Sequence, residues 1–146
     1  MAITSAICNS FKQEILEAEH NFTASTGNTF NLALYTSSAT LGAGTTAYTT
    51  TQEITNTSGT AYQPKGKALT SVTPTLDSST AVCDFADVSW TSASFTANGC
   101  LIFNDSHSTD ASVCAIAFGS DKTVTSGTFT IQFPTADASN AIIRIA

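Results

Sequence analysis

The sequence predicts an all-β protein: one domain over residues 1–146, built as an antiparallel β-sandwich or jelly roll, with a short N-terminal α-helix. Short runs of alternating apolar and polar residues, separated by turn residues, are typical of about seven or eight such strands. A helical spacing of apolar residues occurs near the N-terminus and then disappears. The length of 146 residues, 42% of them hydrophobic, suits one hydrophobic core.

The helix is expected over residues 4–19. Four apolar side chains lie on one stripe at a spacing of three or four residues: Ile7, Phe11, Ile15 and Ala18. Thr4 or Ser5 is available as a cap, and the region of Asn21 is expected to close the helix. Such a helix either packs across an open end of the sheet or binds a neighbouring molecule.

The first strand is expected over residues 29–35, where the alternation is typical of a half-buried strand. Residues 36–66 then form a long polar loop or arm, rich in Ser, Thr and Gly. A structureless loop of that length is uncommon in a compact domain unless it is functional. Within it, residues 46–54 are β-branched enough to form an edge strand, or an arm laid on another chain.

The second half holds the remaining strands, which we expect at residues 68–76, 81–94, 99–103, 113–118, 127–133 and 141–145. Pro74 predicts an edge or bulged strand. The spacing slips between Phe85 and Val88, which predicts a bulge or a break. Nine side chains are expected to be mostly buried: Phe30, Leu32, Leu34, Trp90, Ile102, Ile116, Phe129, Ile131 and Ile143.

Charge and composition exclude several function classes. The net charge is −6, and the five basic residues form no stripe that could neutralise phosphates. Binding to nucleic acid or to an anionic membrane is therefore not expected. The N-terminus lacks the pattern of a signal peptide, so we expect a product made in a cytoplasm. There the four cysteines are expected to be free, buried thiols.

No residue pattern predicts catalysis, a cofactor or a metal. Asp105, His107 and Asp110 share one loop and could supply metal ligands, but Asp and Ser also favour turns, and a surface hairpin loop is the interpretation we adopt. Asp84 and Asp87 could form a pair of glycosidase carboxylates, but their spacing at the slip favours turn or bulge residues.

Several longer sequence segments, taken together, resemble those of a known group of proteins. Cys8-Asn9-Ser10-Phe11-Lys12 opens the expected helix, Val82-Cys83-Asp84-Phe85-Ala86-Asp87-Val88-Ser89-Trp90 follows in the second half, and the chain ends in Ala138-Ser139-Asn140-Ala141-Ile142-Ile143-Arg144-Ile145. With Asn31-Leu32-Ala33-Leu34-Tyr35 and Phe129-Thr130-Ile131-Gln132-Phe133-Pro134, they resemble small structural proteins of tailed bacteriophages. The resemblance implies a non-enzymatic, β-rich virion component, with head decoration (cement) as the expected role.

The leading hypothesis is therefore a capsid decoration protein, assembled in the host cytoplasm, that bridges subunits of the major capsid protein as a homo-oligomer, with a trimer favoured. The alternatives are a tail adaptor, fibre-attachment or baseplate component, and a carbohydrate-binding module or small glycosidase. The candidate contact residues lie in the helix and in the polar arm: Phe11, Ile15, Thr46, Tyr48, Thr50 and Ile54.

Overall fold

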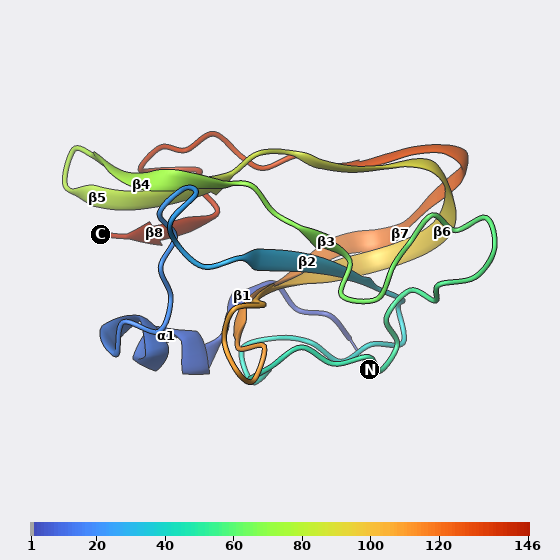
Figure 1. Ribbon diagram of the computed structural model, residues 1–146, viewed down its shortest axis with the longest axis horizontal. Coiled ribbons are helices and arrows are strands. Elements are labelled where there is room, and N and C mark those ends of the chain that lie inside the picture. The colour runs from blue at the N-terminus through green and yellow to red at the C-terminus, as the bar shows by residue number, and fades with distance from the viewer. Residues whose placement is uncertain (1) are drawn as a thin grey trace.

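The computed structural model describes residues 2–146, which form two antiparallel sheets and one short helix. The elements are β1 (Ala6–Ile7), α1 (Asn9–Leu16), β2 (Phe30–Tyr35), β3 (Lys67–Ala68), β4 (Ser71–Asp77), β5 (Thr80–Phe85), β6 (Val88–Asn104), β7 (Ser112–Ile131) and β8 (Ile143–Ile145). Within this range the strand orders are β1-β7-β6-β2-β3 and β4-β5-β8. Figure 1 shows them as two layers. The all-β sandwich is confirmed, and a jelly-roll connectivity stays a prediction.

A long bent hairpin, β6 with β7, joins the two layers. Its pairing runs from Val88 opposite Ile131 to Phe103 opposite Ser112, with four shifts of register on the way. Bulges of this kind let a strand bend while most of its ladder continues. The ribbon therefore curves from one layer into the other (Figure 1). The prediction of separate short strands over this region is wrong. The bulges bend β6 and β7 but do not end them.

Two irregularities predicted around β5 are confirmed. β5 ends at Phe85 and β6 begins at Val88, so the slip in spacing marks a strand break. The register between β4 and β5 also shifts between Val72 and Thr75, at the position of Pro74. Since proline cannot donate to a ladder, the edge position of β4 is consistent with its sequence.

The helix is shorter than the expected range of 4–19. Residues Ala6–Ile7 form β1 and pair with β7. The backbone N–H of Cys8 also donates to the Val113 carbonyl, so the N-terminal segment is held in an extended form until α1 begins. Pairing with a distant strand has overridden the local helical pattern. At the other end Ala18 has a φ of 61°, which closes the helix before Asn21.

Residues 36–66 pack on their own domain. They cover the outer face of the five-stranded sheet, where a second apolar cluster forms from Ile3, Ala33, Tyr35, Ala39, Leu41, Leu101, Phe103 and Ala115. This cover buries β2 on both faces, so the expected half-buried strand is wrong. Residues 46–54 make isolated bridges at Ala47 and Glu53 and form no edge strand.

The exposed surface of the whole molecule supports the same conclusion. It is 7242 Å² for a chain of 15.1 kDa. A folded monomer of that mass is expected to expose about 7,100 Å². An extended arm would add to this area, so the segment 36–66 is folded onto the sheet.

A buried carboxylate, Glu53, attaches this segment to the sheet. Its Oε1 accepts hydrogen bonds from the Tyr62 hydroxyl at 2.7 Å and from the Lys65 N–H at 2.8 Å. Its Oε2 accepts one from the Tyr48 hydroxyl at 2.6 Å. The Tyr62 hydroxyl in turn accepts from the Leu34 N–H of β2 at 2.9 Å. Three donors thus satisfy a charge that would be costly to bury alone.

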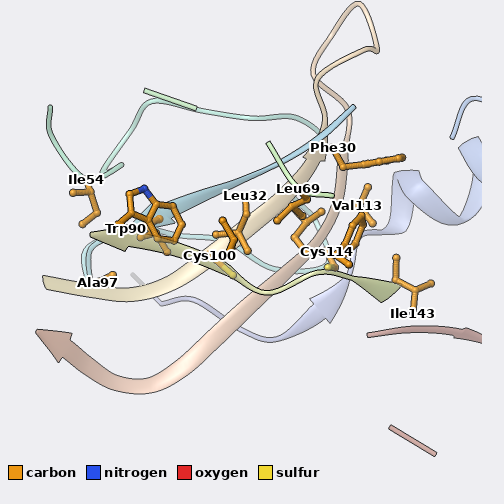
Figure 2. Packing of buried hydrophobic residues seen from close by; sticks show 14 of the residues in the cluster. Phe30, Leu32, Ile54, Leu69, Trp90, Ala97, Cys100, Val113, Cys114 and Ile143 are labelled. Carbon is orange, nitrogen blue, oxygen red and sulfur yellow. The ribbon is translucent and has the colours of Figure 1, made fainter. Parts of the chain in front are cut away.

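The main core lies between the layers, and six of the nine expected residues are buried in it: Phe30, Leu32, Leu34, Trp90, Ile102 and Ile143. Ile116, Phe129 and Ile131 are half-buried, because they line a groove where the two parts of β7 face each other. Figure 2 shows this core, with Ile54 of the covering segment at one end and Ile143 of β8 at the other.

All four cysteines are buried and free, as predicted. Burial raises the pKa of the Cys83 and Cys100 thiols to about 12 and also raises that of Cys8 and Cys114. Since the thiolate is the nucleophile, a raised pKa makes these groups inert at neutral pH.

Removing the Tyr62 hydroxyl is expected to destabilise the protein more than removing that of Tyr48. Tyr62→Phe leaves the Leu34 N–H without its acceptor and takes one donor from Glu53, which should cost about 2–3 kcal/mol. Tyr48→Phe removes one donor at a half-buried site and should cost about 1 kcal/mol. Urea unfolding of both variants measures the difference. Equal costs would contradict the central role given to Tyr62.

The native protein is expected to resist alkylation by iodoacetamide at about pH 8, because its thiols are buried and protonated. In denaturant all four cysteines should react. Intact-mass spectrometry counts the added groups in each state. Rapid labelling of the native protein would show that a thiol is accessible.

Candidate functional site

The candidate site is an apolar cleft at one end of the sandwich, between α1 and the inner face of the β4-β5-β8 sheet. Its volume is about 450 Å³. One wall carries Phe11, Ile15 and Ala18 from α1 and the turn after it. The other wall carries Ala81, Cys83, Ile143 and Ile145. In Figure 1, α1 and the β4-β5-β8 sheet lie at the same end of the molecule.

Strand register builds the sheet wall. Cys83 lies opposite Ile143, and Ala81 lies opposite both Ile145 and Leu76 on its two neighbouring strands. Residues directly opposite each other point to the same face of a sheet. Leu76, Ala81 and Ile145 therefore form one apolar row. Leu76 is 73% exposed and Ile145 is 56% exposed, so the row extends from the cleft into solvent.

His20 fixes the position of the helical wall. Its side chain is buried, with Nε2 at 2.8 Å from Glu14 Oε2 and Nδ1 at 3.2 Å from Asn104 Nδ2. An Asn104 N–H that donates to Nδ1 leaves Nε2–H to donate to the carboxylate. Phe11 packs on the same ring, with centroids 4.9 Å apart. The end of β6 thus holds α1 through this histidine.

The helical wall is also acidic. Glu14, Glu17 and Glu19 lie on α1 and just after it, against one nearby lysine, Lys12. The carbonyl groups at the C-terminal end of α1 add partial negative charge beside Ala18. No lysine or arginine is among the residues that line the cleft within the described range. The opening therefore combines an apolar floor with a negative rim.

The candidate contact residues named from sequence do not come together. Phe11 is 3% exposed and Ile54 of the covering segment is 7% exposed; both pack in the main core, so neither presents a surface to a neighbour. Tyr48 stacks on Phe103 with centroids 4.8 Å apart. Of the six, Phe11 and Ile15 line the cleft, and Thr46 and Thr50 are exposed elsewhere.

The loop between β6 and β7 binds a lysine. Lys65 Nζ lies 2.8 Å from Asp105 Oδ1 and 2.8 Å from Asp110 Oδ2. These two carboxylates raise the pKa of Lys65. His107 lies 3.4 Å from Glu19. Within residues 2–146 no three His, Cys, Asp or Glu side chains are grouped as a metal site.

The other carboxylate pair has a structural role. Asp87 accepts a hydrogen bond from the Phe133 N–H at 2.8 Å, across the break between β5 and β6. Asp84 lies on β5 opposite Val72 of β4. Asp87 thus lies at the strand break, as the sequence interpretation expected, whereas Asp84 is a paired strand residue and that interpretation is wrong for it.

Comparison with known proteins adds no identification. No protein-family model, no curated protein and no solved structure matches this chain. No helix in the described residues is long and apolar enough to span a membrane. Sequence reasoning found the helical wall through Ile15 but missed the sheet wall, which depends on the register of three strands distant in sequence.

The two apolar residues of α1 are expected to differ in their effect on stability. Phe11→Ala removes a buried ring and should lower the free energy of unfolding by about 3–5 kcal/mol. Ile15→Ala removes part of a cleft wall that is already half open to water and should cost about 1–2 kcal/mol. Urea unfolding compares them. A larger loss of unfolding free energy for Ile15→Ala than for Phe11→Ala would contradict this orientation of the helix.

Proposed function

We propose that this chain is a non-enzymatic structural protein of a tailed-phage virion, and that it decorates the capsid by bridging neighbouring subunits of the major capsid protein. The observation that carries the proposal is the incompletely covered end of the sandwich, where Leu76 and Ile145 extend an apolar cleft into solvent. Exposed apolar surface of this kind marks sites of protein interaction. The resemblance of several sequence segments to small structural phage proteins suggests the virion context of this proposal.

A decoration protein acts through surface area that it buries between capsid subunits. In the rest of this domain the four thiols are buried, and Glu53 is buried with its hydrogen bonds made. This suits a stable protein with no reactive surface groups of this kind. Added contacts of this kind stabilise a shell by mass action, because they bind the assembled state and not the separated subunits.

A second groove supports the homo-oligomer in this proposal, with a trimer favoured. It is about 640 Å³ in volume and is lined by half-buried side chains of β7 and the C-terminal region, among them Ile116, Phe118, Phe129 and Phe133. Across residues 112–136 the charged side chains are Asp121 and Lys122, one of each sign. Copies that each carry −6 repel one another least through a neutral face.

Copy number in purified particles of the phage that encodes this chain tests the proposal. Decoration predicts hundreds of copies per particle, set by capsid symmetry, whereas a tail component is present in roughly a dozen or fewer. Quantitative mass spectrometry against the major capsid protein measures the ratio. A low copy number would favour the tail alternative, and absence from the particle would end the proposal.

A further inference from the structure

We propose that the cleft between α1 and the β4-β5-β8 sheet binds an extended segment of a partner protein, with aliphatic side chains at alternate positions and lysine or arginine at its ends. The inference rests on the proposed function only for the identity of the partner: if the chain is a decoration protein, the segment belongs to the major capsid protein.

The backbone of β8 supports an extended occupant. β8 is the last strand of its sheet, and in the described residues its backbone hydrogen bonds go to β5. The opposite edge therefore offers free N–H and C=O groups to an added strand. Addition of a strand to an exposed edge is an established mode of peptide recognition, with pockets that take alternate side chains.

The apolar row supports alternate aliphatic side chains. Ile143 and Ile145 lie two residues apart and point to the same face, into the cleft. A strand beside β8 would place every second side chain on that face. Those side chains would continue the row beyond Ile145 and would cover the part of Ile145 now open to water.

Charge decides between kinds of partner. Glu17 and Glu19 flank Ala18, which lines the cleft, and both side chains are exposed. Because Glu19 lies 3.4 Å from His107 Nε2, Glu17 is the carboxylate of this pair that has no basic partner in the described residues. These carboxylates and the C-terminal end of α1 attract a cation. A second copy of the chain would bring the same acidic rim to this opening and be repelled. Basic ends on the segment are therefore part of the proposal.

The test uses the full chain, labelled with ¹⁵N, and a synthetic peptide of three valine–threonine repeats with two lysines at each end, acetylated and amidated. Addition of the peptide should shift the amide signals of Ala81, Ile143 and Ile145. A matched peptide with glutamates in place of the lysines should bind about tenfold more weakly, and salt should weaken the lysine peptide.

Four variants localise the binding. Ile145→Ser should weaken it by about tenfold, a loss typical of one buried apolar contact, because Ile145 lines the cleft on β8, the strand that the segment would pair with. Val72→Ser is the matched control, because Val72 is an exposed apolar residue on β4 that does not line the cleft. Glu17→Lys should weaken the lysine peptide and strengthen the glutamate peptide. Asp121→Lys makes the same change of net charge on β7 and should leave both unchanged.

Three results would overturn the proposal. One is equal binding of the two peptides, and another is a set of signal shifts away from the cleft or none at about millimolar peptide. The third is self-association in sedimentation equilibrium that Ile145→Ser abolishes, because it would identify a second copy as the occupant. Peptide binding is measured on the isolated protein and copy number on the particle, so one can fail while the other holds.

Discussion

The buried carboxylate of Glu53 is the constraint on which the outer half of this fold depends. Between His20 and Lys65 it is the one Asp, Glu, Lys, Arg or His side chain in the sequence. It binds two tyrosine hydroxyls and a backbone N–H, and through Tyr62 it reaches the backbone of β2. A segment with few apolar residues could not offset its ordering cost by burial alone. Hydrogen bonds to a desolvated charge, together with the few apolar side chains it does bury, hold it against the sheet.

The strands were predictable where the signal is local. The strand over residues 30–35 and the break between Phe85 and Val88 depend on neighbouring residues, and both are present in the fold. The burial of β2 on both faces depends on the distant segment 36–66 and was not predicted. The N-terminal helix was overextended because residues 6–7 pair with β7, more than a hundred residues away. Composition also misled for residues 36–66. A low apolar content suggested an arm, although Leu41, Ile54 and Tyr62 were available for burial.

The candidate site shows the same division. Ile15 could be named from helical spacing, because its neighbours on the stripe are three or four residues away. The row of Leu76, Ala81 and Ile145 could not, since it exists only once β4, β5 and β8 are in register. Each of these residues alone is an ordinary apolar residue in a strand, and scattered exposed apolar residues need no explanation. Aligned beside the cleft, the three residues form one continuous apolar surface.

The acidic rim and the apolar floor are best understood together. An open apolar end on a β-sheet invites association between copies of the same chain, and exposed strand edges make that risk greater. Like charges at the opening oppose such association at long range, while short-range apolar contact remains available to a partner of opposite charge. Under the proposed binding mode Glu17 therefore has two roles. It keeps identical molecules apart at this end, and it favours a basic segment that can approach, pair with β8 and close the sandwich.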